Sequence, residues 1–186
     1  ALILSNNAQG FNHITLNTSR PIRTPVGTLE MQVIGGKLES SEFTWLNNDP
    51  NYSDWRYITA FNISYQPKWL PGLFVGLTRS FQAYQSSLDS FGDYFPFFTP
   101  YEKVRDKNQD ELGQDAKDQL TSVYGRWLFN KAHAEVYFEY GVNDKAYNFR
   151  DFIGSPEHSR TYLGGLRKMI PLNARPNEFV QVNVEV

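Results

Sequence analysis

Residues 55–65 read WRYITAFNISY, and their side chains alternate in character along the chain. The odd-numbered positions carry four aromatic rings, whereas the even-numbered positions include Arg56, Asn62 and Ser64. Because successive side chains of a strand point to opposite faces, this period of two predicts a half-buried β-strand. The function depends on whether the apolar face of that strand meets a protein core or lipid.

The same alternation recurs along the chain, and helical periodicity is scarce. It predicts about eight strands, at residues 11–18, 28–35, 55–65, 73–81, 119–129, 134–142, 158–168 and 179–186. The facing of 73–81 stays open, because Arg79 falls among its apolar positions. Residues 20–27, RPIRTPVG, are rich in residues that break strands, so we expect a turn there.

The predicted connections alternate between short and long. Residues 66–72 and 130–133 are short links, whereas 37–54, 82–118 and 143–157 are long. A hairpin needs only a few residues to turn, so the three long connections must have another reason. Outer-membrane barrels show this asymmetry, with short turns on one side of the membrane and long loops on the other. Strands of about ten residues, at about 3.3 Å each and tilted near 40°, span about 25 Å, the height of an apolar membrane band.

A soluble β-sandwich or lipocalin-like barrel is the alternative, with the apolar faces packed inward. Aromatic residues at strand ends, apolar faces without acidic residues on the five clearest strands, and the unequal loops favour lipid. We therefore predict an all-β fold, an antiparallel transmembrane β-barrel with long external loops. Residues 1–186 are expected to be a single outer-membrane β-barrel domain, a fragment of a larger barrel that is incomplete at both ends.

Composition narrows the picture. The 186 residues carry a net charge of −2 and no basic run, which gives no reason to expect nucleic acid as a partner. The chain has no Cys, which excludes disulfides and thiolate chemistry. No stretch approaches the roughly 20 apolar residues of a membrane-spanning helix.

Two blocks of the sequence resemble a known family. They are SNNAQGFNHITLNTSRPIRTPVGTLEMQVIGGKLES, from residue 5 to 40, and FEYGVNDKAYNFRDFIGSPEHSRTYLGGLRK, from residue 138 to 168. Both resemble the capsule assembly protein Wzi family in its Bacteroidetes-type version. The resemblance implies an outer-membrane β-barrel of a Gram-negative bacterium, larger than eight strands, with a periplasmic helical plug that this chain lacks. It also implies a lectin-like role with exported capsular polysaccharide.

Polar residues of the strands are expected to line the barrel interior. They are Glu30, Gln32, Arg56, Glu135, Glu139 and Arg167, together with Asn62, Arg126 and Glu185. They either line a permeable lumen or form ion pairs that fill a wet interior, and the second alternative is favoured. Glu135 and Glu139 lie about 13 Å apart along one strand, beyond the roughly 5 to 9.5 Å that glycosidase carboxylates need. A carboxylate on a neighbouring strand could still serve as the second group, but catalysis is the disfavoured alternative and we expect no enzyme.

Neither a metal nor another cofactor is expected. The three His residues show no ligand spacing. The run DKNQDELGQDAKD starts like a calcium loop, but Glu111 replaces the required Gly and Lys117 replaces the closing Glu. A solvated acidic loop is the favoured interpretation.

Aromatic and polar residues of the loops are the candidates for binding. The glycan or partner contacts are assigned to Trp45, Tyr52, Tyr94, Phe95, Phe97, Tyr101, Arg150, Asp151, Glu157 and His158. Exposed rings stack on sugars or dock proteins. The alternative is that the loop from residue 91 to 101 folds its own small core over the barrel mouth.

Three functions follow from these expectations. The first is a non-enzymatic, lectin-like protein that assembles or attaches surface polysaccharide in the outer membrane. The second is a structural or accessory subunit of a larger outer-membrane protein complex, and the third is a diffusion channel. The expected partners are outer-membrane lipid, surface polysaccharide and other outer-membrane proteins.

Overall fold

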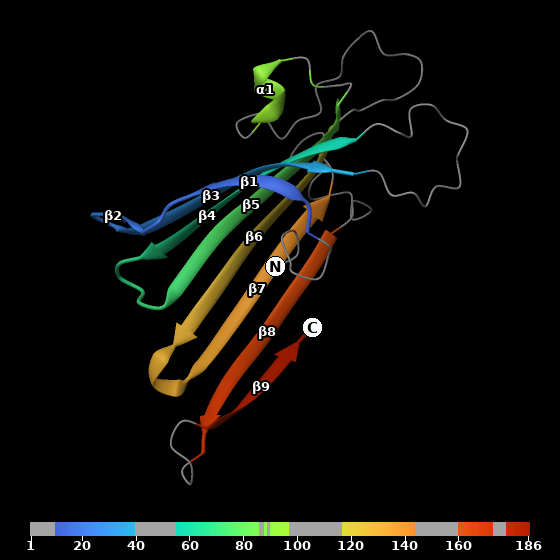
Figure 1. The fold of residues 1–186 in the computed structure, drawn as a ribbon. Helices are drawn as coiled ribbons and strands as arrows, with labels where there is room; N and C mark the ends of the chain where they lie inside the picture. Colours follow the sequence, from blue (N-terminus) through green and yellow to red (C-terminus); the bar gives the residue numbers. More distant parts are fainter. Residues whose placement is uncertain are drawn as a thin grey trace, which may run out of the picture.

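The computed structural model describes residues 10–39, 55–85, 88, 90–96, 117–143, 160–172 and 178–186. Within these residues the fold is one antiparallel sheet of nine strands, which confirms the all-β prediction, and the sheet is not closed into a barrel (Figure 1). The strands are β1 (Asn12–Asn17), β2 (Ile22–Thr24), β3 (Gly27–Leu38), β4 (Arg56–Pro67), β5 (Leu73–Tyr84), β6 (Lys117–Phe129), β7 (Ala134–Asn143), β8 (Arg160–Pro171) and β9 (Phe179–Glu185).

The strands follow one another in the sheet in the order β1-β3-β4-β5-β6-β7-β8-β9, and β2 pairs with β3 beyond the end of β1. All eight predicted strands are present, with most of their ends shifted by a few residues. The additional strand β2 lies in the segment that was predicted to be a turn. It has three residues between Pro21 and Pro25, too few for an alternation to be visible in the sequence.

The connections lie at two ends of the sheet according to their length. The segments 68–72, 130–133 and 172–178 are short, and they join strands at one end, which we call the turn end. The segments 39–55, 85–116 and 144–159 are long and leave from the opposite end, the loop end. The predicted alternation of short and long connections is therefore confirmed.

The backbone geometry explains two of the short turns. Gly72 has φ 86°, and a Cβ on it would lie 2.4 Å from the carbonyl oxygen of Leu128, so only Gly fits. His133 ends the 3-10 turn η3 (Asn130–Ala132) with φ 46°, the left-handed conformation that closes the β6–β7 hairpin. Lys168 of the neighbouring strand donates a hydrogen bond to the carbonyl of Ala132 and fastens the same turn.

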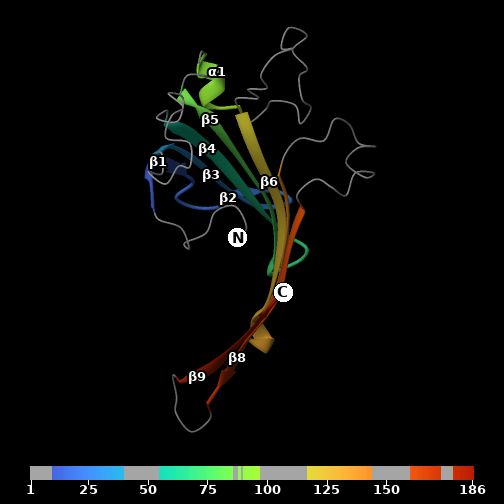
Figure 2. The same ribbon diagram turned by 90° about the vertical axis from the view of Figure 1, so that its right-hand side faces the viewer.

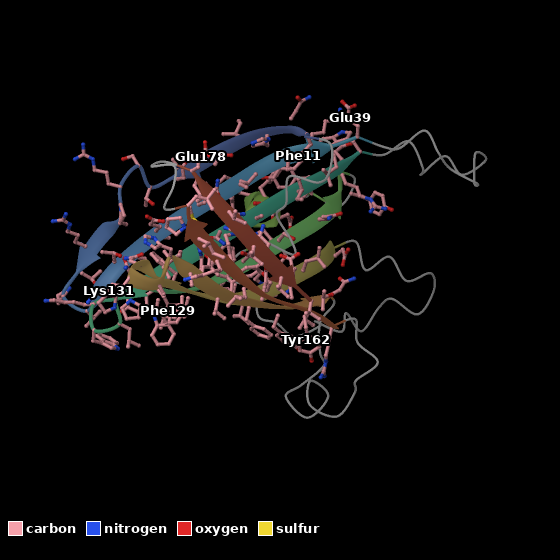
Figure 3. All side chains as sticks on the ribbon, turned by 90° about the horizontal axis from the view of Figure 1, so that it is seen from below. Phe11, Glu39, Phe129, Lys131, Tyr162 and Glu178 are labelled. Atoms are coloured by element: carbon pink, nitrogen blue, oxygen red, sulfur yellow. The ribbon has the colours of Figure 1, made fainter. Side chains whose placement is uncertain are left out.

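The sheet is strongly curved, and its two faces differ (Figure 2). The strand register places the even-numbered residues of β3–β6 and the odd-numbered residues of β7–β9 on one face. We call this the concave face, and we call the opposite one the convex face. Phe129 and Tyr162, which belong to the convex face, lie on the outer side of the curve (Figure 3).

One short helix is described, α1 (Phe91–Tyr94), above the loop end of the sheet (Figure 1). Ser90 caps it, because the Ser90 amide and hydroxyl both donate to the Asp93 carboxylate at 2.8 Å. Among the described residues no helix has the length and apolar character needed to cross a membrane.

Candidate functional site

Large apolar side chains stay exposed on the convex face. In the strands this set comprises Ile14, Leu16, Ile22, Met31, Val75, Val123, Trp127, Phe129, Val136, Phe138, Tyr162, Leu166, Ile170, Val180, Val182 and Val184. Of the large apolar side chains exposed in the described strands, only Tyr84 and Phe179 lie on the concave face. An exposed apolar surface of this extent marks contact with a partner or with a membrane.

Aromatic rings mark both ends of this apolar surface. Toward the loop end, the rings of Tyr140 and Tyr162 lie 5.1 Å apart. Toward the turn end, the rings of Trp127 and Phe129 stack at 5.2 Å. Val123 lies directly opposite Tyr140, and Phe138 lies between the two levels. Belts of aromatic residues at two levels are typical of a surface that crosses the two interfaces of a membrane.

The convex face carries basic residues and no acidic ones in the described strands. Lys37 and Arg160 lie at the loop end, and Lys168 lies near the turn end. Lys37 also places its ammonium 5.4 Å from the ring of Trp55. Basic groups at the edges of an apolar band reach toward water or lipid phosphates with their charged ends, whereas acidic groups lack this partner.

One part of the convex face is covered by protein. Arg79 lies there near the middle of β5 and is only 8% exposed. Its guanidinium lies 4.7 Å from the ring of Phe81 and donates to the side-chain oxygen of Gln119 at 2.9 Å. Phe81 and Gln119 are also buried, and so is Thr59 on β4. The open question of the facing of β5 is thus resolved: Arg79 belongs to the apolar face, in a part that neither water nor lipid reaches.

The concave face carries a cluster of ion pairs near the turn end. The Glu135 carboxylate accepts a hydrogen bond from Arg126 at 2.7 Å and lies 3.6 Å from a terminal nitrogen of Arg167. Arg167 also donates to the side-chain oxygen of Asn183 at 3.2 Å. The cluster thus spans β6, β7, β8 and β9. Because the Glu135 side chain is 11% exposed and the two guanidinium groups are 47% and 42% exposed, the cluster lies at a wet surface.

A second polar network lies farther toward the loop end of the concave face. The Ser122 hydroxyl is fully buried and donates to Glu139 at 2.7 Å. Asn62 donates to Thr78 at 2.7 Å and accepts a hydrogen bond from the Tyr124 hydroxyl at 3.2 Å. Polar partners therefore continue from β4 to β9 along this face.

Two tyrosines of the concave face lie flat over glycines of a neighbouring strand. A Cβ on Gly76 would lie 2.2 Å from the ring of Tyr124, and a Cβ on Gly165 would lie 2.3 Å from the ring of Tyr137. The Tyr137 hydroxyl passes over Gly165 and donates to Glu185 at 2.6 Å. Sequence reasoning missed these pairs, because their partners are recognisable only when the register of the strands is known.

The structure brings together all residues that were predicted to line an interior. Glu30, Gln32, Arg56, Glu135, Glu139 and Arg167 all lie on the concave face. Arg56 donates to the Tyr84 hydroxyl at 2.6 Å, whereas Glu135 and Arg167 form an ion pair. Glu135 and Glu139 have different hydrogen-bond partners, and the two carboxylates do not share one site.

Most of the predicted loop contacts lie outside the described residues: Trp45, Tyr52, Phe97, Tyr101, Arg150, Asp151, Glu157 and His158. Two are described. The ring of Tyr94 packs against Tyr57 at 5.2 Å, and the ring of Phe95 lies 5.6 Å from Phe91. In the described part of the chain no three His, Asp or Glu side chains are grouped to hold a metal ion.

Comparison with protein-family models, with curated proteins and with solved structures found no match. The resemblance to the Wzi family therefore rests on the two sequence blocks alone. The geometry of the two faces is the remaining guide to function.

Proposed function

We propose that this chain forms part of the wall of an outer-membrane β-barrel of a Gram-negative bacterium. The convex face lies against acyl chains and the concave face lines a hydrated interior. The distribution of side chains between the two faces carries the proposal. The convex face combines exposed apolar side chains, two aromatic belts and a lack of acidic residues in its described strands. The concave face holds ion pairs with half-exposed arginines.

A soluble sandwich accounts less well for this arrangement. In a sandwich, a second layer of protein covers the apolar face of the sheet. Val123 and Phe138, near the middle of the convex face, are 48% and 50% exposed. The side chains buried on the convex face of the described strands lie mainly on β4 to β7, and they include Thr59, Arg79, Phe81, Ala83, Gln119 and Val142. Lipid is the environment that suits the remaining apolar surface.

A barrel wall in lipid requires partners for the two outer strands. β1 and β9 each pair with one neighbour only within the described sheet. An unpaired strand edge is too costly in hydrocarbon, because its N–H and C=O groups lose their hydrogen bonds to water. We propose that further strands pair with β1 and β9 and close the barrel around the concave face.

The proposed role of the barrel is non-enzymatic and lectin-like: it retains or assembles surface polysaccharide. The resemblance to the Wzi family supports this role. The collection of all long connections between described strands at the loop end supports it as well, because binding residues are often carried by loops on a rigid scaffold. Phe97, Tyr101, Arg150 and His158 in these connections are the proposed sugar contacts.

A glycan array tests the lectin-like role. The full-length protein is incorporated into lipid nanodiscs and exposed to purified surface polysaccharides. We expect binding that is lost when Phe97 and Tyr101 are both replaced by Ala. Trp69→Ala is the matched control, because Trp69 is an aromatic residue in the turn at the opposite end and is 65% exposed. Absence of glycan binding, together with co-purification of a stable protein partner, contradicts this role and favours an accessory subunit.

A diffusion channel is the second candidate, and the charged concave face favours it. Arg126 and Arg167 are both half-exposed and lie on either side of Glu135. If this face lines a conducting pore, replacing both arginines by Gln should shift the ion selectivity measured in planar bilayers toward cations. A lack of conductance in the unmodified protein rules out this candidate.

A further inference from the structure

The short helix α1 is held on the convex side of the sheet. The ring of Tyr94 meets the ring of Tyr57 edge-on, with 5.2 Å between the centroids, and Tyr57 belongs to the convex face of β4. Pro96, which follows the helix, is buried. α1 is therefore placed beside the surface that is proposed to face lipid, above the loop end of the strands (Figure 1).

All three rings of this segment are exposed, and Tyr94 is the least exposed of them at 37%. Phe91 is 82% exposed and Phe95 is 42% exposed, and their centroids lie 5.6 Å apart. The Ser90–Asp93 hydrogen bonds fix the turn that carries both rings. Tyr94 contacts Tyr57, so the turn presents the Phe91 and Phe95 rings from a fixed position.

The polar groups beside these rings suit a lipid interface better than a sugar. A bound sugar must find hydrogen-bond partners for its hydroxyls, or their desolvation costs binding energy. Neither Phe supplies one, and one oxygen of the Asp93 carboxylate already accepts two hydrogen bonds from Ser90. Phe is among the residues with which interfacial segments enter the boundary between headgroups and acyl chains.

The same level of the convex face carries other interfacial features. Lys37 and Trp55 form a cation–π pair of 5.4 Å, and Tyr57 lies directly opposite Lys37 in the sheet. Aromatic rings with a basic residue beside them are typical of the headgroup region of a membrane. α1 thus continues the loop-end aromatic belt outward from the sheet.

We propose that α1 is a membrane-interface anchor whose Phe91 and Phe95 rings enter the headgroup region of the bilayer around the convex face. This inference rests on the proposed membrane location of the sheet. It assigns Phe95 to lipid, whereas the sequence suggested a glycan or partner contact for that residue. The anchor would fix the height of the loop end relative to the bilayer surface.

Site-directed spin labelling tests the anchor, and the chain suits it because it contains no Cys. A single nitroxide label is placed on the full-length protein in lipid vesicles through Phe91→Cys. Val136→Cys, on the convex face and 45% exposed, is the lipid reference, and Lys131→Cys, in the exposed turn η3, is the water reference. Collisions of the label with oxygen and with a water-soluble nickel chelate are then compared.

We expect the label at Phe91 to collide with the nickel chelate several-fold less often than the label at Lys131. Its depth should be about 5–10 Å below the headgroup surface. The Phe95→Cys variant should give the same result and guards against a local disturbance at Phe91.

Two other outcomes overturn the anchor in distinguishable ways. If Val136 is shielded from nickel but Phe91 and Phe95 are as accessible as Lys131, the anchor is wrong while the membrane wall stands. If purified polysaccharide then immobilises the Phe91 label, the rings bind sugar instead. If all labels collide freely with nickel, the membrane wall itself is wrong.

Discussion

The environment of the convex face can be tested with one charge placed at two depths. Leu166 lies near the middle of β8, and Ile170 lies one residue before its turn end. Both are aliphatic residues of the convex face and are 43% and 45% exposed. Lys168 lies midway between them, so an added Arg at either position meets nearly the same repulsion from it.

The expected difference follows from the distance between the two positions. Four residues cover about 13 Å along a strand, or about 10 Å in height at a tilt near 40°. An Arg costs about 2–4 kcal/mol at the middle of a bilayer and about 0–1 kcal/mol near its interface. Leu166→Arg should therefore destabilise the protein by about 1–3 kcal/mol more than Ile170→Arg, about 5- to 150-fold in the unfolding equilibrium.

The assay is denaturant unfolding of the full-length protein from lipid vesicles. Gln181→Arg, on the concave face of β9, controls for the effect of an added charge and should change the free energy of unfolding by no more than about 0.5 kcal/mol. If the convex face were exposed to water, both positions would tolerate Arg to within about 0.5 kcal/mol, because their exposures are equal. Equal effects of the two substitutions refute the reasoning.

Two further predictions concern the concave face. Gly165→Ala should destabilise the fold by about 1–3 kcal/mol, because its Cβ would lie 2.3 Å from the Tyr137 ring. Gly164→Ala is the matched control, since a Cβ there meets nothing within 4 Å, and equal unfolding midpoints for the two variants contradict the close packing. Glu135→Gln should cost about 1–2 kcal/mol, because it leaves two neighbouring arginines without their shared carboxylate. The cost should shrink at high salt, and a free energy of unfolding that is unchanged in low salt argues against the ion-pair cluster.

Much of the sheet could be predicted from the sequence, because each strand carries its own period of two. β7 is an example: Glu135 and Glu139 fall on one face, and Val136 and Phe138 fall on the other. Residues that share a face along β3, β4, β7 and β9 were therefore assigned correctly before any pairing was known. The separation of short and long connections followed from the same strand boundaries.

What could not be predicted depends on contacts between strands. The position of Tyr137 over Gly165 requires the register of β7 and β8, which alternation leaves open. The facing of Arg79 was ambiguous because its burial depends on Phe81, Gln119 and a covering layer that no local pattern reveals. The location of α1 on the convex side follows from the contact between Tyr57 and Tyr94, which are separated by 36 positions of the chain.

The most direct test of the membrane-wall proposal is a scan of single cysteines along β9. Each cysteine is labelled with a fluorophore, and the quenching of its emission by brominated lipids is measured. All residues from Phe179 to Glu185 are exposed in the structure, so exposure alone predicts uniform contact with water. The membrane-wall proposal predicts strong quenching at Val180, Val182 and Val184 and weak quenching at Gln181 and Asn183, which alternate with them. Uniformly weak quenching along the strand contradicts the proposal.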